Sequence, residues 1–148
     1  MACLALAALV SATGACGSRS AGISSSAHGA ARALEIDPGA SGGSVLACPL
    51  EPAATPCAPL ARGGAVATPA RIKTTRGARA RVDLGDGATA DLAGEASISI
   101  AADGRVGVEQ GLVTLDDARA RDVQILDHVA RVGDAKTTLS VLVGAADR

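Results

Sequence analysis

Apolar and polar residues alternate through most of the chain after position 78, and this period of two is the feature that most constrains the fold. Positions 79–84 have the sequence RARVDL, so Ala80, Val82 and Leu84 share one side of an extended chain and the charged residues share the other. Strict alternation of this kind is typical of half-buried β-strands. The series of inward-facing apolar residues continues with Ala90, Leu92, Ile98, Ile100, Val106, Val108, Val113, Leu115, Val123, Ile125, Val129, Leu139, Val141 and Val143.

Glycine-containing turn signals separate these runs. GDG at 85–87 and ADG at 102–104 are typical of hairpin turns, because Gly tolerates a positive φ. AGE at 93–95, QG at 110–111 and GD at 133–134 predict further turns. Strands therefore recur about every 8 to 12 residues, which predicts an all-β domain of short antiparallel strands and hairpins, in a sandwich, barrel or solenoid.

An internal echo fits stacked hairpins. DGATADLAG at 86–94 and DGRVGVEQG at 103–111 both begin with Asp-Gly and end with Gly at the same spacing. Two copies are too few to establish a solenoid. DDARARDVQ at 116–124 lacks an apolar stripe, so we expect a connecting loop there rather than a helix.

The composition limits both the core and the function. The chain has no Phe, Tyr or Trp, so its core must be built from Val, Ile, Leu and Ala. Stacking on single-stranded bases normally needs aromatic side chains. The net charge of -1 gives no general attraction to nucleic acid or to an acidic membrane surface. We therefore expect no nucleic-acid partner.

The first residues have the layout of an export signal. An apolar stretch at 4–10 leads into small residues and then Cys16, and it is far shorter than the roughly 20 apolar residues of a transmembrane helix. TGAC at 13–16 resembles the lipobox of bacterial lipoproteins, which implies lipidation of Cys16, and Gly17 after it implies the outer membrane. The alternative is an ordinary secretory signal cut at ATGA or SATG. Either way we expect an extracytoplasmic protein, in the periplasm or at the outer membrane, with Cys3 removed.

The composition predicts three regions. Residues 1–15 form the signal peptide, and residues 16–61, rich in Gly, Ala, Ser and Pro, form a flexible, disordered tether. Within the tether, ARALEI at 31–36 is compatible with a helical turn or a strand. Residues 62–148 form the β domain.

Cys48 and Cys57 bracket the segment CPLEPAATPC. An oxidising compartment makes a disulfide between them plausible. Free thiols are a second possibility. A metal site is the third, but it needs further ligands, and the histidines, His28 and His128, lie far away in the sequence. We expect no cofactor and no metal.

The β region resembles the FecR domain. The resemblance covers roughly residues 62–148 and is strongest in RIKTTRGARARVDLGDGATADLAGEASISI at 71–100 and GRVGVEQGLVTLDD at 104–117. Residues 74–84 are similar to the first strands of that family. The turn, the following strand pair and the final segment correspond to Leu84, Asp86, Gly87, Val106, Val108, Gly111, Val113, Val129, Gly133, Leu139 and Val141.

This resemblance implies an extracytoplasmic β-sandwich or β-solenoid-like domain. The best-known members span the membrane and relay receptor occupancy to a sigma factor, but neither a transmembrane helix nor a cytoplasmic segment is recognisable in this sequence. We therefore expect a lipid-anchored, non-enzymatic module for interaction or signalling in the cell envelope. The alternative is a structural or ligand-binding envelope protein that binds polysaccharide or peptidoglycan.

A basic cluster is the best candidate for a binding surface. On neighbouring strands its residues would form one polar face opposed by Asp83, Asp91 and Glu95, and cross-strand pairs of this kind contribute roughly 0.2–1 kcal/mol each. The bland interpretation is a solvated sheet face; the functional one is a site for an envelope protein or an anionic envelope polymer. The cluster consists of Arg71, Lys73, Arg76, Arg79 and Arg81.

The other polar residues give no catalytic pattern. His128 could act as a base with Ser140 as nucleophile, but nothing around them resembles a nucleophile elbow, and a surface histidine is the simpler interpretation. Asp116 and Asp117 are neighbours, whose side chains diverge on a strand. GDGATADLAG lacks the Lys of a phosphate loop. A weak calcium site at the turns would draw on residues without EF-hand spacing, namely Asp83, Asp86, Asp91 and Asp103.

Overall fold

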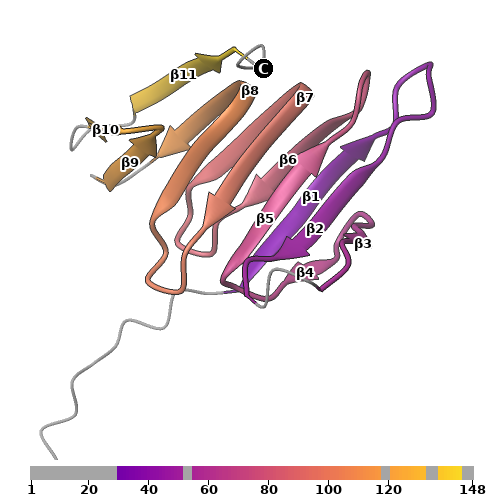
Figure 1. Ribbon diagram of the computed structural model, residues 1–148, viewed down its shortest axis with the longest axis horizontal. Helices are drawn as coiled ribbons and strands as arrows, with labels where there is room; N and C mark the ends of the chain where they lie inside the picture. The colour runs from indigo at the N-terminus through magenta and orange to yellow at the C-terminus, as the bar shows by residue number, and fades with distance from the viewer. Residues whose placement is uncertain (1–29, 52–54, 118–120, 133–136, 145–148) are drawn as a thin grey trace, which may run out of the picture.

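The computed structural model describes residues 30–51, 55–117, 121–132 and 137–144. These residues form no helix, so the predicted all-β class is confirmed (Figure 1). Strand bounds are β1 Ala31–Asp37, β2 Val45–Pro49, β3 Ala58–Pro59, β4 Ala65–Val66, β5 Ala70–Thr74, β6 Arg79–Asp83, β7 Thr89–Ile100, β8 Val106–Asp117, β9 Arg121–Ile125, β10 His128–Val132 and β11 Thr137–Val143.

The long hairpin of β7 and β8 organises one curled sheet (Figure 1). The first half of β7 pairs with β6 and its second half with β5. In the same way, the start of β8 pairs with β9 and its second half with β11. The strands therefore divide into a first half-sheet, β4-β1-β6-β7-β8-β11, and a second half-sheet, β3-β2-β5-β7-β8-β9-β10, with β7 and β8 common to both.

Two glycines mark the bend where the hairpin passes from one half-sheet to the other. Gly94 in β7 has φ 70° and Gly111 in β8 has φ 80°, which L side chains rarely adopt. A Cβ on Gly111 would lie 2.5 Å from the Cα of Ala96, so only Gly fits there. Thr74 stabilises the bend from β5, because its hydroxyl donates to the Gly94 carbonyl and accepts from the Ala96 N–H at 3.0 Å.

These glycines correct the prediction of turns at 93–95 and 110–111. Both segments are bends inside continuous strands, because the pairing of β7 with β8 shifts register there instead of ending. The hairpin turns predicted at 85–87 and 102–104 are present, between β6 and β7 and between β7 and β8. The echo in the sequence now has a structural meaning: each copy runs from a hairpin turn to a bend glycine.

One hydrophobic core lies between the half-sheets and uses the predicted alternation. Its largest fully buried side chains are Ile72, Leu92, Ile98, Ile100, Leu115, Val82, Val106, Val108, Val113 and Val123. The prediction is wrong at Val129, which is 62% exposed, whereas Val132 at the other end of β10 is 3% exposed. In the short edge strand β10, contact with the core occurs only at one end.

The predicted tether is wrong over its described part. β1 pairs antiparallel with β6, and β2 pairs antiparallel with β5, so the sheet begins at Ala31 rather than near Arg62. Ala31 and Ala33 are fully buried, and ARALEI is a strand. The described Gly and Ser residues of the predicted tether form the turn between β1 and β2 at 38–44. Small side chains here allow close packing rather than flexibility.

The end of the domain departs from a purely antiparallel arrangement. β9 follows β8 after a short connection and pairs with the start of β8 in parallel. Arg121 therefore begins a strand, and only the middle of the expected loop at 116–124 lies between strands. The signal segment 1–15, Cys16, His28, and the turn at 133–134 lie outside the described residues. Where the chain is described, there is no helix of the length and apolarity that crossing a membrane requires.

Candidate functional surfaces

The basic cluster does not form one face. Arg71 and Lys73 lie on β5 in the second half-sheet, whereas Arg79 and Arg81 lie on β6 in the first, and Arg76 is in the turn between them. β5 and β6 each pair with β7 but not with each other. Consecutive strands of a hairpin usually pair, but here the bend of β7 sends them to opposite half-sheets. The expectation of a single polar face is therefore corrected.

Arg71 is held by Glu109 of β8. Its Nε and Nη2 atoms donate to the two carboxylate oxygens at 2.6 and 2.8 Å, and the Ser97 hydroxyl donates to the same carboxylate at 2.9 Å. Burial raises the pKa of Glu109, but hydrogen bonds from Arg71 and Ser97 and the nearby positive charges outweigh it, so this pKa lies below its ordinary value. The hydrogen bond from Arg71 to Glu109 likewise raises the pKa of Arg71.

Other members of the cluster also face acidic neighbours. Arg81 lies 3.8 Å from a carboxylate oxygen of Asp91 and 4.0 Å from one of Asp116. Arg76 lies 3.7 Å from Glu95, but both side chains are largely exposed. Arg79 is opposite Asp37 in the register of β6 and β1. Four of the five basic residues thus face acidic groups, and the exposed Lys73 alone does not make a positive patch.

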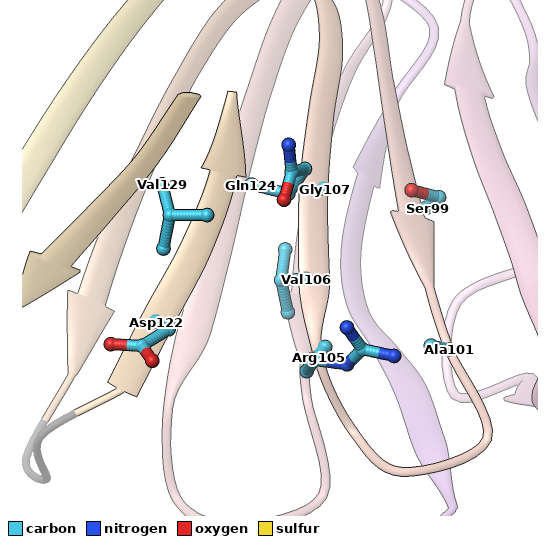
Figure 2. A pocket seen from close by; sticks show the side chains of 8 residues that line it. All are labelled: Ser99, Ala101, Arg105, Val106, Gly107, Asp122, Gln124 and Val129. Atoms are coloured by element: carbon cyan, nitrogen blue, oxygen red, sulfur yellow. The ribbon is translucent and has the colours of Figure 1, made fainter. Parts of the chain in front are cut away.

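A groove that the sequence analysis missed lies on the outer face of the second half-sheet (Figure 2). Its volume is about 320 Å³. Ser99, Gly107, Gln124 and Val129 come from β7, β8, β9 and β10 and lie opposite one another in the register, so they form one row across the sheet. A Cβ on Gly107 would approach the Ser99 hydroxyl to 2.5 Å, so the absence of a side chain at Gly107 leaves this space open.

Charged side chains at one end of the groove are paired internally. Arg105 binds Asp103 at 2.6 Å, and Arg131 binds Asp122 at 2.9 Å. Hydrogen bonds from the backbone and side chain of Arg105 lower the pKa of Asp103, and a hydrogen bond from Arg131 lowers that of Asp122. The groove thus offers hydroxyl, amide and paired charged groups beside the apolar Val129. Such a lining suits an uncharged ligand rich in hydrogen-bonding groups.

Cys48 and Cys57 form a disulfide, the first of the three alternatives. Cys48 lies in β2 and is 6% exposed, whereas Cys57 lies just before β3. The bond attaches the short edge strand β3 to β2, where Leu46 pairs with Pro59. The disulfide thereby reinforces the pairing of β2 with β3 at the edge of the second half-sheet.

The remaining polar candidates are dispersed. His128 is exposed at the start of β10, in the second half-sheet. Ser140 lies on β11 in the first half-sheet, where its hydroxyl is 3.2 Å from that of Thr114. The two residues therefore do not form one site. The turn aspartates are already engaged: Asp83, Asp86 and Asp103 each accept a hydrogen bond from the backbone N–H two residues later, and Asp86 also pairs with Arg121 of β9. Among the residues that the structure describes, no group of His, Cys, Asp and Glu has the arrangement of a metal site.

Comparisons with the models of known protein families, with curated proteins and with solved structures find no match to this chain.

Proposed function

We propose that this chain is an exported, lipid-anchored protein whose FecR-like β domain acts as a non-enzymatic interaction or signalling module of the cell envelope. The single observation that supports this compartment most strongly is the disulfide between Cys48 and Cys57. Disulfides form and persist in oxidising compartments and are rare in the cytosol. The signal-like segment at 1–16 supports the same conclusion independently.

The charge arrangement favours a protein partner over an anionic polymer. Binding of a polyanion depends on cations whose charge is free to replace counterions. Here Arg71 is bound to Glu109, and Arg81 faces both Asp91 and Asp116. A surface of alternating charges instead gives specificity toward a partner with the complementary pattern.

Capture from envelope extracts tests this proposal. The wild-type chain and an Arg79→Glu/Arg81→Glu variant would be cross-linked in extracts of the source cells, with His128→Gln as a control on the opposite half-sheet. We expect one defined protein to be recovered with the wild type and the control, and to be depleted about tenfold or more with the charge-reversal variant. Recovery of no protein partner, together with retention on purified cell-wall polymer, would overturn the proposal.

The groove around Gly107 favours a second candidate function, binding of a polysaccharide or peptidoglycan strand. Its Ser99 and Gln124 side chains can exchange hydrogen bonds with sugar hydroxyls or with amides. A Gly107→Val substitution would fill the groove from its floor. If this function is correct, retention on purified peptidoglycan or polysaccharide is lost in Gly107→Val but kept in Arg79→Glu/Arg81→Glu. Equal retention of wild type and Gly107→Val would exclude the groove.

A further inference from the structure

Among the described strands, several lie at an edge of the sheet, and all but one of these carry features that discourage pairing with another chain. β3 and β4 have two residues each, and β3 ends in Pro59. β1 contains three charged residues and a register shift between Ala33 and Glu35. β10 contains Arg131, which is bound to Asp122. Short length, proline, charge and bulges are the common devices by which proteins protect sheet edges.

β11 is different from these edges. It has seven residues, TTLSVLV, with no charge, no proline and no glycine. Its register with β8 runs from Thr137 to Val143 without a shift, so the strand is regular along its whole length. Within the described parts of the chain it pairs with β8 alone, and Figure 1 shows it as the outermost strand on that side. A long, uncharged, regular edge is a template for a further strand.

The outer face beside this edge is apolar at one end. Leu142 is 77% exposed, and its cross-strand neighbour Leu112 on β8 is 43% exposed. They are two of the five exposed large apolar side chains among the described residues. The other end of β11 is polar, because the Thr138 hydroxyl donates to Asp116 at 2.5 Å. From Thr138 onward, the edge therefore combines backbone groups that pair with no other described strand and an apolar side chain at one end.

We propose that β11 pairs with β11 of a second copy of this chain, antiparallel and around a twofold axis, to form a dimer with a continuous sheet. Antiparallel pairing of two identical strands around a twofold axis closes on itself and leaves neither β11 edge open. An arrangement centred on Ser140 places Leu142 of each copy opposite Thr138 of the other. This inference is independent of the proposed function, because it rests on β11 and not on the charged surfaces or on the groove.

The charge distribution supports a second copy as the occupant. β11 has no charged residue, so no like charges meet across the axis. The nearest described acidic side chain is Asp116 on β8, opposite Thr138. Antiparallel pairing places the two copies of Asp116 at opposite ends of the interface, with both β11 strands between them. Self-pairing of β10 would instead place an Arg131 from each copy, and therefore two like charges, in the same interface.

Sedimentation velocity of the full chain over a concentration series tests the dimer, with Cys16→Ala to prevent lipidation. A Ser140→Lys/Leu142→Lys variant places two positive charges on each edge, and the matched control Val129→Lys places one on the β10 edge. We expect the wild type and the control to dimerise, and the β11 variant to dimerise about tenfold or more weakly. Circular dichroism would show that all three chains remain folded, as expected because Ser140, Leu142 and Val129 are exposed.

Hydrogen exchange of the wild-type chain provides a second measurement that needs no substitution. Amides of β11 that point away from β8 should exchange slowly at concentrations where the dimer forms and fast after dilution, while β10 amides stay unchanged. A wild type that remains monomeric throughout the series would refute the proposal. Undiminished dimerisation of the Ser140→Lys/Leu142→Lys variant would also refute it, and so would loss of the dimer in Val129→Lys alone. In either case the contact between the two copies would use another surface.

Discussion

At the scale of single residues, the bend of β7 and β8 depends on a few residues whose role the alternation of apolar and polar positions did not indicate. Gly94 and Gly111 have positive φ, and Gly111 also faces the backbone of Ala96 directly. Thr74 is 5% exposed and faces inward from β5, as Ile72 of the same strand does. Its hydroxyl satisfies backbone groups that the bend leaves without strand partners. A lone buried threonine in an apolar series is the signal that would have indicated this bend.

The two bend glycines should differ in their tolerance of alanine. Gly94→Ala introduces backbone strain only, because nothing lies within 4 Å of the added Cβ. Gly111→Ala adds a contact of 2.5 Å with Ala96 to the same strain. We expect Gly94→Ala to lower the free energy of unfolding by about 1 kcal/mol and Gly111→Ala by about 3 kcal/mol or more. Urea unfolding would measure both, and equal losses would show that β8 relaxes freely at the bend.

Glu109 should make stability depend on pH. Its pKa is lower in the folded chain than its ordinary value of 4.5, so the unfolded chain takes up protons first as the pH falls. The stability from the bound carboxylate is therefore complete above about pH 5 and is lost as the pH falls through the folded pKa.

A Glu109→Gln variant isolates this contribution. We expect it to be about 1 kcal/mol less stable than the wild type at pH 7, with the difference shrinking toward pH 3. Glu95→Gln is the matched control, because Glu95 and Arg76 are 59% and 89% exposed and should contribute little. Urea titrations at several pH values would test this, and a pH-independent difference would mean that packing rather than charge is responsible.

At the scale of elements, the existence of most strands was predictable and their partners were not. The period of two located β6, both halves of β7 and β8, and the β9 and β11 residues that face the core. It treated the halves of β7 and β8 as separate strands, because a glycine within a strand and a glycine in a turn give the same local signal. It left β1 open between a helical turn and a strand and did not indicate β2, because the Gly, Ser and Pro residues between and around these two strands suggested a tether.

The disulfide should stabilise the edge formed by β2 and β3. Cys48 and Cys57 are nine positions apart, and a short closed loop of this kind contributes slightly less than about 3 kcal/mol. A Cys48→Ala/Cys57→Ala variant should lose this amount in urea unfolding, and the reduced wild-type chain should lose the same. The reductant should leave the variant unchanged. A stability of the wild type that is insensitive to reduction would contradict a structural role for this bond.

At the scale of the whole molecule, the half-sheets enclose one core made without any aromatic side chain. Strands common to both half-sheets make this possible, because the β7–β8 hairpin contributes inward residues to each. The same arrangement separates basic residues that are close in the sequence. It also brings together four residues from different strands that are distant in the sequence, namely Ser99, Gly107, Gln124 and Val129. The candidate groove is thus a product of the tertiary fold.

The proposed lipid anchor belongs to this scale as well, because it would decide where the domain acts. Because TGAC at 13–16 resembles a lipobox, we expect the mature chain to begin with an acylated Cys16. Its acyl chains would contribute roughly 0.8 kcal/mol per buried CH₂ to membrane binding. Mass spectrometry of the mature N-terminus and membrane fractionation of Cys16→Ala would test this. The variant should appear in the soluble fraction. An unmodified N-terminus at any other residue would instead support an ordinary secretory signal.

The sequence by itself determined the all-β class, the inward face of most strands and the two hairpin turns. These properties depend on interactions between near neighbours, which alternation and turn chemistry record directly. Only the tertiary structure decided that β5 and β6 belong to opposite half-sheets, that β9 runs parallel to β8, and that a groove opens above Gly107. Those outcomes depend on pairing between residues far apart in the chain and on the bend at Gly94 and Gly111. Pairing between distant strands leaves no periodic signal along a single sequence.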